Sequence, residues 1–291
     1  MFSLRYQVFL RCGLCALLAV LATGCQTVQT TQTGTVGIDR VQRVSSLVNR
    51  DDLARQASLQ YAQTLKEADK AVNADPAMTE KVRAIAARLI EQTPVFRPDA
   101  KQWDWEINVI QSEELNAWCM PGGKIAIYSG MIDRLKLSDD EVAAVTGHEI
   151  AHALREHSWE KASEIAVANV GLGVLGALAG SGYSTAGGLL YTVMFQLPNS
   201  REMETESDRI GVELAARAAY HPKAAISLWQ KMAQAGSAGV PPFLSTHPSS
   251  ESRQADLERY AQIVMPLYEQ AVAERTKALK NYSGSLIQID I

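Results

Sequence analysis

Two histidines and a glutamate form the most chemically informative pattern in this 291-residue chain, in the run His148-Glu149-Ile150-Ala151-His152. On a helix, positions four apart differ by about 40° and share one face, so both imidazoles can bind the same metal ion. Glu149 lies beside them, where its carboxylate can take a proton from a water molecule at the metal. The alternative is a pair of solvated histidines on an ordinary helix. The pattern favours a zinc site that activates water for hydrolysis.

A catalytic zinc ion needs a third protein ligand and one open coordination position. The next acidic segment offers four carboxylates: Glu202, Glu204, Glu206 and Asp208. Glu204 and Asp208 share one helical face, which continues into apolar residues, whereas Glu206 points nearly the opposite way. Because an inward carboxylate needs a partner, we expect Glu204 to bind zinc and Asp208 to accept a hydrogen bond from His148. The alternative is a charged helix face in solvent.

The helices that must position these residues are predicted from apolar spacing and capping residues. Ser138-Asp139-Asp140-Glu141 is a capping box, which predicts the start of the helix that carries the two histidines. The apolar, glycine-rich stretch 165–180 is expected to be a helix followed by a loop and not a membrane span. Further helices are predicted at 51–72, 79–90, 201–219, 222–233 and 252–278, the last with a break at Pro266.

Short β-strands are predicted just before the capping box. Residues 105–109 alternate between apolar and polar, and the runs 115–119 and 124–128 are separated by Pro121-Gly122-Gly123. The expected fold class is therefore α+β: mainly helical, with a small antiparallel β-sheet beside the histidine helix.

The first residues predict export. Arg5 and Arg11 precede an apolar run at 12–22, which ends in small residues and is short for a membrane span. This is the pattern of a signal peptide. The alternatives are a plain secretory signal that is cleaved near Cys25 and an N-terminal anchor helix.

The end of this signal resembles a bacterial lipobox, in which the cysteine receives diacylglycerol and becomes the new N-terminus. Its sequence is Leu-Ala-Thr-Gly-Cys at 21–25, with Leu21 one position earlier than the usual lipobox leucine. Gln26 follows the cysteine where Asp would retain a lipoprotein in the inner membrane, so the pattern resembles outer-membrane sorting in Gram-negative bacteria. We therefore expect a chain that is lipid-anchored through Cys25 in the outer membrane and faces the periplasm.

Composition and charge bound the remaining possibilities. Hydrophobic residues make up 47% of the chain, charged residues 21%, and the net charge is −4, so the chain resembles an ordinary folded protein and offers no electrostatic basis for nucleic-acid binding. Once Cys25 carries lipid, Cys119 is the one structural cysteine and no intrachain disulfide is expected. The predicted organisation is a signal peptide with lipobox at 1–24, a flexible tether at 25–45, a metallopeptidase domain at 46–283 and a C-terminal tail at 284–291.

The motifs together resemble the HtpX and CAAX-prenyl-protease type of zinc metallopeptidase, a gluzincin family. The resemblance extends over about residues 72–253 and rests on Asn116-Ala117-Trp118, Pro121-Gly122-Gly123, His148 to His152, Leu197-Pro198, Ser200-Arg201, Glu204 to Asp208, Thr246-His247-Pro248 and Arg253. Ser207 departs from the family, which usually has Ala there. With the lipobox, the chain most resembles periplasmic lipoprotein members of the BepA and LoiP type, which act in outer-membrane protein quality control.

This resemblance implies one Zn²⁺ per chain and a substrate that binds in extended form. The strand after Pro121-Gly122-Gly123 would be the sheet edge that receives the substrate by strand addition, and Asn116 and Ala117 would contact the substrate backbone. For Asn116, a turn residue is the alternative.

The resemblance also implies roles near the C-terminal end of the domain. His247 would approach the zinc, either to stabilise the transition state or as an inhibitory fourth ligand, and a turn histidine is the alternative. Arg253 would orient that loop or neutralise Glu204 or Asp208. We expect His157 and His221 at the surface or in turns.

The function expected from these features is that of a lipid-anchored zinc metalloendopeptidase of the cell envelope, with Glu149 as the general base. Its partners would be unfolded or misassembled outer-membrane or periplasmic proteins as substrates, the membrane through the N-terminal lipid, and the outer-membrane assembly machinery. One alternative is a chaperone-like assembly factor whose zinc site is held mostly inactive by His247. A structural zinc lipoprotein is the other alternative, but it would not need the carboxylate of Glu149.

The lipobox generates a direct prediction about the mature N-terminus. We expect the membrane-extracted protein to begin at a lipidated Cys25, because the cysteine after Gly24 would receive the acyl groups. Mass spectrometry of the N-terminal peptide measures this. An unmodified Cys25 or a retained Met1 would contradict it, and Cys25→Ala provides the matched control that should stay unprocessed.

Overall fold

The computed structural model describes residues 25–176, 186–236, 239–248 and 250–287. The predicted signal peptide at 1–24 lies outside the described residues. The strands in this part of the chain are β1 (Cys25–Val28), β2 (Gln42–Ser45), β3 (Glu106–Ile110), β4 (Ala117–Met120) and β5 (Lys124–Tyr128). The helices are α2 (Arg50–Ala68), α3 (Pro76–Ile90), α4 (Ser129–Asp133), α5 (Asp139–Leu154), α6 (His157–Gly176), α7 (Ala186–Tyr191), α8 (Arg201–Arg217), α9 (Ala224–Ala235), α10 (Pro242–Thr246), α11 (Glu251–Ile263) and α12 (Met265–Ile287).

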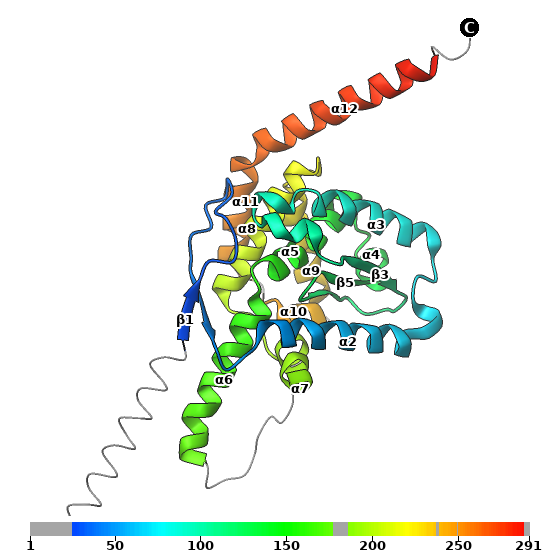
Figure 1. Ribbon diagram of the computed structural model, residues 1–291. Helices are drawn as coiled ribbons and strands as arrows, with labels where there is room; N and C mark the ends of the chain where they lie inside the picture. The colour runs from blue at the N-terminus through cyan, green and yellow to red at the C-terminus, as the bar shows by residue number, and fades with distance from the viewer. Residues whose placement is uncertain (1–24, 177–185, 237–238, 249, 288–291) are drawn as a thin grey trace, which may run out of the picture.

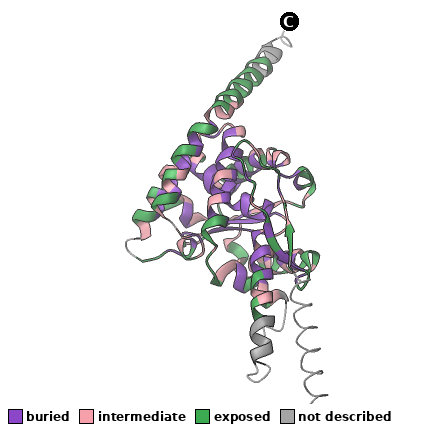
Figure 2. Ribbon diagram, turned by 90° about the vertical axis from the view of Figure 1, so that its left-hand side faces the viewer, coloured by how far each residue is buried: buried purple, intermediate pink, exposed green. Residues whose placement is uncertain are grey.

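Short helical turns complete the chain: 3₁₀ turns η1 (Asp69–Ala71), η2 (Thr93–Val95) and η3 (Pro98–Gln102), and a π-helical turn η4 (Thr192–Gln196). The helices form one body around α5, with α12 leaving it at one end and α6 at the other (Figure 1). Buried residues gather where the central helices meet the sheet, whereas the outer part of α12 is mostly exposed (Figure 2). The predicted α+β, mainly helical architecture is confirmed.

Helix α5 forms where the capping box predicted it and lies in the centre of the body. Ser138 Oγ accepts a hydrogen bond from the Glu141 backbone N–H, and Glu141 Oε2 accepts one from the Ser138 backbone N–H. Two of the unpaired N–H groups at the start of the helix are satisfied in this way. Every residue from Val142 to Leu154 is buried, so α5 is surrounded by protein on all sides. A helix in this position holds its polar side chains away from bulk water.

Helices α5 and α8 cross at a pair of glycines. A Cβ atom added to Gly211 would lie 2.8 Å from the backbone nitrogen of His148, and one added to Gly147 would lie 3.0 Å from the Gly211 carbonyl oxygen. A Cβ atom at Gly211 would force the α5 backbone to shift, and one at Gly147 would be tightly crowded, so glycine at these positions permits the close approach of the two backbones. The crossing brings the histidines of α5 close to the first turns of α8, which carry Glu204 and Asp208.

The sheet beside α5 is mixed and not wholly antiparallel as predicted. Its strand order is β3-β5-β4, with β5 antiparallel to β4 and parallel to β3. Gly122 and Gly123 have φ of +83° and +85°, which suits the tight turn between β4 and β5. The strand after that turn, β5, therefore lies in the middle of the sheet, and the prediction that it forms the receiving edge was wrong. The edge strands are β3 and β4, and β4 is the one that packs against α5.

The N-terminal segment, residues 25–45, is folded onto the body and is not a flexible tether. Strands β1 and β2 form an antiparallel pair, and β2 packs against α6. Val36, Ile38 and Val44 are each no more than 3% exposed. The segment contains few apolar residues, but the structure buries these, and charged contacts described below hold the rest.

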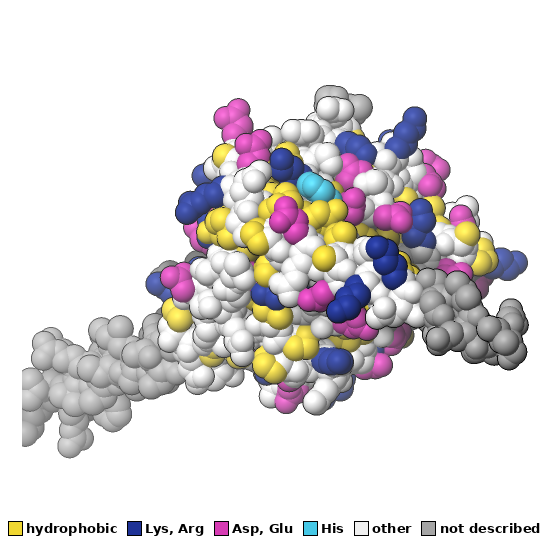
Figure 3. Space-filling view, turned by 90° about the horizontal axis from the view of Figure 1, so that it is seen from above, with side chains coloured by type: hydrophobic (Ala, Val, Ile, Leu, Met, Phe, Trp, Pro, Cys, Tyr) yellow, Lys and Arg dark blue, Asp and Glu magenta, His cyan; other side chains and the backbone are white. Residues whose placement is uncertain are grey.

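The C-terminal end also differs from the prediction. Helix α12 continues to Ile287, so residues 284–287 are helical where a loose tail was expected. No helix in the described part of the chain is both long enough and apolar enough to span a membrane. On the face seen from above in Figure 1, basic and acidic side chains are interspersed (Figure 3).

The glycine crossing predicts an unusual response to alanine. Gly211→Ala gains about 1 kcal/mol of helix propensity, but the new methyl group must displace the backbone of α5, which typically costs about 1–3 kcal/mol. We therefore expect a net loss of stability, measured as the denaturant midpoint of unfolding. The matched control is Gly187→Ala in α7, where the new group meets only the end of the Gln56 side chain at 3.3 Å. Gly211→Ala with wild-type or higher stability would show that the crossing is not constrained.

Candidate metal centre

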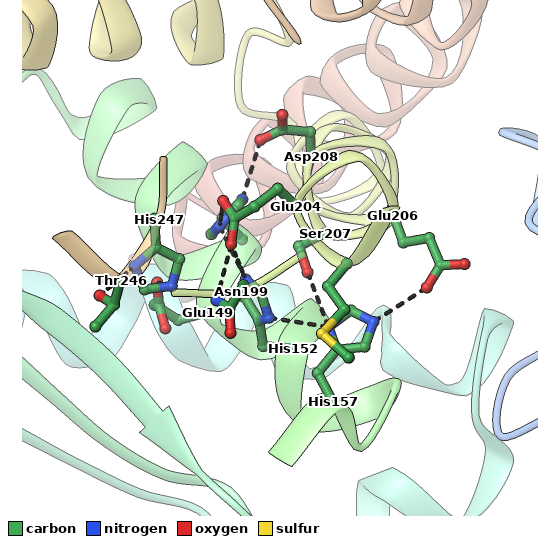
Figure 4. Close-up of polar contacts among 12 residues, drawn as sticks. Glu149, His152, His157, Asn199, Glu204, Glu206, Ser207, Asp208, Thr246 and His247 are labelled. Atoms are coloured by element: carbon green, nitrogen blue, oxygen red, sulfur yellow. Dashed lines mark hydrogen bonds and ion pairs between the residues drawn. The ribbon is translucent and has the colours of Figure 1, made fainter. Parts of the chain in front are cut away.

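Four side chains from three elements converge in the interior. His148 and His152 come from α5, Glu204 from α8, and His247 from the residue that ends α10. One ligand atom from each can be chosen so that all four lie within 4.8 Å of one another, and all four side chains are buried (Figure 4). The sequence prediction of a shared histidine face and an inward Glu204 agrees with this placement.

Hydrogen bonds fix the orientation of His148. Its Nδ1 lies 3.0 Å from Asp208 Oδ1, and Asp208 in turn accepts two hydrogen bonds of 2.7 Å from Arg253. Because an ionised carboxylate only accepts, Nδ1 of His148 is the protonated ring nitrogen and its Nε2 faces the cluster. Arg253 also lies over the Trp229 ring and donates to the Pro248 carbonyl oxygen.

His152 is oriented by a histidine. Its Nδ1 lies 2.9 Å from Nδ1 of His157, and Nε2 of His157 lies 3.0 Å from Glu206 Oε2. Nε2 of His152 then faces the cluster, 3.1 Å from Nε2 of His148 and 3.3 Å from Glu204 Oε1. Two imidazole nitrogens and a carboxylate thus converge on one point. Such a donor set can hold a cation, and it suits zinc, which binds neutral imidazole and carboxylate.

The electrostatics of the cluster also favour positive charge at its centre. Burial alone would lower the pKa of His148, but the hydrogen bonds to Asp208 and Glu204 outweigh it and raise the pKa to about 9. Burial lowers the pKa of His152 to about 4, so this ring is neutral near pH 7. A proton and a metal ion therefore compete at His148, while His152 keeps a free ring nitrogen for a metal.

Glu149 differs from Glu204 and Asp208, which Arg253 contacts. Its Oε1 is buried and has no hydrogen-bond partner among the described residues, and Nε2 of His247 is 3.5 Å away. Burial, with the nearby charge of Glu204, raises the pKa of Glu149 to about 8. A carboxylate in this state can hold a proton near neutral pH.

A cavity of about 320 Å³ opens beside these groups and contains the predicted substrate contacts. Glu149, His152 and His247 are among the residues that line it, and so are Asn116 and Ala117. Ala117 begins the edge strand β4. The cavity is also lined by Trp118 on β4 and by aromatic and apolar residues in and next to the π-helical turn η4: Tyr191, Val193, Met194 and Phe195.

Three residues that contact the candidate metal ligands, directly or through one other residue, were not predicted from the sequence. His157 was expected at the surface or in a turn but is 2% exposed, because it opens α6 directly beneath His152. Glu206 was placed on an outward face, but the N-terminal segment covers that face. Asn199, just before α8, donates from Nδ2 to Glu204 Oε1 at 2.8 Å. For His157, its position five residues after His152 was the sequence feature that could have indicated the contact. His221 is half-buried in the turn before α9, as expected.

Comparison with known proteins finds a family match over the part of the chain that contains these residues. The model of peptidase family M48 matches residues 76–261. Mitochondrial metalloendopeptidase OMA1 of Saccharomyces cerevisiae is 34% identical over 175 residues, which cover 57% of this chain and 50% of that protein. The human mitochondrial metalloendopeptidase OMA1 is 31% identical over 192 residues, covering 61% and 36%.

A bacterial protein aligns over more of the chain. The beta-barrel assembly-enhancing protease of Escherichia coli K12 is 27% identical over 224 residues, which cover 72% of this chain and 44% of that protein. The chain thus spans about a third to a half of the length of these relatives.

Proposed function

Because the chain belongs to peptidase family M48, we propose that it is a zinc metalloendopeptidase of the cell envelope that cleaves unfolded or misassembled proteins. The family membership confirms the resemblance, the metallopeptidase class and the zinc cofactor that were predicted from the sequence. The observation that carries the proposal is the convergence of His148, His152 and Glu204 beside the buried Glu149, whose Oε1 has no hydrogen-bond partner among the described residues.

In this proposal, His148, His152 and Glu204 hold the metal. Bound zinc supplies a Lewis acid that polarises a peptide carbonyl and lowers the pKa of water from about 15.7 to about 7. Glu149 would accept on Oε1 a proton from the water molecule that attacks the peptide carbonyl carbon, and would deliver it to the leaving amine as the C–N bond breaks. Its buried position, which raises its pKa, helps it keep the proton between the two steps. Asp208 and Asn199 keep the imidazole and carboxylate in place.

The proposed substrate binds as an added strand. Strand β4 lies at the sheet edge and lines the cavity, so an extended peptide can pair with its free side. Asn116 and Ala117 would then contact the substrate backbone near Glu149. Strand addition requires a chain segment without secondary structure of its own, which favours unfolded or misassembled proteins over folded ones.

The proposed location is the outer membrane, facing the periplasm, with Cys25 as the lipid anchor. The lipobox pattern at 21–25 supports it, and so does similarity to a bacterial protease named for enhancing β-barrel assembly. On this basis we propose misassembled outer-membrane proteins as substrates and the assembly machinery as a partner.

Four variants test which residues hold the metal and which residue transfers the proton. His148→Ala, His152→Ala and Glu204→Ala should each lose bound zinc, whereas Glu149→Gln should retain zinc and lose hydrolysis, because Glu149 moves a proton and does not hold the metal. Zinc content and cleavage of an unfolded test protein are measured on the same samples. Full zinc content in Glu204→Ala would move the third ligand to another carboxylate. Wild-type cleavage by Glu149→Gln would exclude the proposed base.

A second candidate function is that of an assembly factor whose zinc site is held mostly inactive by His247. The observation that favours it is the position of His247 within the ligand cluster. Its Nδ1 lies 3.2 Å from the Phe243 carbonyl oxygen, and its Nε2 faces the cluster, 3.5 Å from Glu149 Oε1. Burial holds the pKa of His247 well below the usual value, so the ring is neutral. A neutral imidazole with a free inward nitrogen is a good zinc ligand.

His247→Ala separates the two candidates. If His247 blocks the metal, the variant should cleave an unfolded protein faster than wild type. If it stabilises the transition state, kcat should fall by about 10²–10³-fold, as for other lost transition-state contacts. His221→Ala is the matched control, because His221 lies outside the cluster. An unchanged rate with zinc retained would exclude both roles.

A further inference from the structure

The two histidines of α5 are supported in different ways. His148 contacts a carboxylate directly, which is the common arrangement for a metal-binding imidazole. His152 instead contacts the ring of His157, and the carboxylate of Glu206 lies one residue further out. This second chain of contacts is buried and is not used by the proposed mechanism.

The hydrogen-bond donors in this chain can be assigned from the acceptor at its outer end. Glu206 accepts from two arginines and is ionised, so Nε2 of His157 must carry the proton that points at it. Nδ1 of His157 is then an acceptor, and it receives the Nδ1 proton of His152. Ser207 Oγ, 3.4 Å from the same nitrogen, can add a second donor. His157 therefore fixes which ring nitrogen of His152 faces the metal.

Glu206 is held by the N-terminal segment. Arg40 donates to its two oxygens at 2.7 and 3.0 Å and also makes paired contacts of 2.7 and 2.9 Å with Glu160 on α6. Arg155 donates to Glu206 from the other side, and also to the Arg40 carbonyl oxygen and to Thr31 Oγ1. The carboxylate that orients His157 is thus fixed between the core and residues 31–40.

We propose that His157 is a positioning residue for His152 and that Arg40, acting through Glu206, makes the N-terminal segment an integral part of the metal centre. This rests on the proposed role of His152 as a zinc ligand. Its consequence is that zinc affinity depends on a residue of the segment that joins the catalytic body to the anchor at Cys25. The arrangement differs from a passive tether, whose sequence would not affect the metal.

The first test exploits two substitutions of nearly equal shape. His157→Asn keeps a polar atom near the position of Nδ1, where its amide oxygen can accept the His152 proton, whereas His157→Leu has no acceptor. We expect Leu to weaken zinc binding about 10–100-fold, measured by chelator competition, and Asn to stay close to wild type. Thermal unfolding of the zinc-free proteins reports folding separately. Equal losses of affinity in both variants, or no loss in Leu, would overturn the proposal.

The second test uses a matched pair of arginines and remains decisive if His157→Leu does not fold. Arg40 and Arg217 have side chains 31% and 25% exposed, and each joins the N-terminal segment to a buried glutamate of α8. Of these two arginines, Arg40 contacts Glu206, the glutamate that touches His157, whereas Arg217 contacts Glu213. Arg40→Ala should weaken zinc binding about tenfold, whereas Arg217→Ala should leave it unchanged even if it lowers stability. Equal zinc affinities in the two variants would overturn the role of Arg40.

One further variant separates this inference from the proposed function. His152→Ala is measured in the same zinc titration. If it loses zinc while His157→Leu and Arg40→Ala bind like wild type, the metal site stands and the positioning role is wrong. If His152→Ala itself binds zinc like wild type, the proposed ligand set fails and the positioning role fails with it.

Discussion

The close approach of two helix backbones is the constraint on which the rest of the structure depends. Helices α5 and α8 can cross at Gly147 and Gly211 because neither position has a side chain. The crossing places His148 and His152 on one helix against Glu204 on the other, in a buried space where unpaired polar groups are costly. Contacts from Asp208, Asn199 and His157 then orient these side chains.

Support for the centre comes from both ends of the domain. Asp208 and Arg253, together with the loop at Pro248, hold His148 from the C-terminal side. His157 and Glu206, together with Arg40, hold His152 from the N-terminal side. Segments more than 200 residues apart in the sequence therefore act on two imidazoles whose Nε2 atoms are 3.1 Å apart. A centre built in this way requires that both ends of the domain be folded.

Local rules predicted the parts of this site that lie on single helices. The spacing of His148 and His152, the capping box at Ser138 and the shared face of Glu204 and Asp208 depend only on helical geometry, and the structure has each of them. The contacts of Glu206 could not be predicted in this way, because the segment that covers it is distant in sequence and poor in apolar residues. The prediction of a wholly antiparallel sheet was also wrong. The alternation in β3 and β5 indicates strands but does not say that β3 pairs with β5 in parallel.

The folded N-terminal segment restricts where the active site can reach. A flexible chain of the 21 residues from 25 to 45 would have a root-mean-square span of about 25 Å, so an anchored enzyme could sweep a wide shell above the bilayer. Because β1 pairs with β2 and Arg40 binds Glu160, the proposed lipid-carrying residue Cys25 belongs to the same folded unit as the cavity. If Cys25 carries the proposed lipid, the cavity would stay within a narrow range of distances from the membrane surface. Substrates would then have to diffuse to the cavity, because no flexible tether would carry the cavity to them.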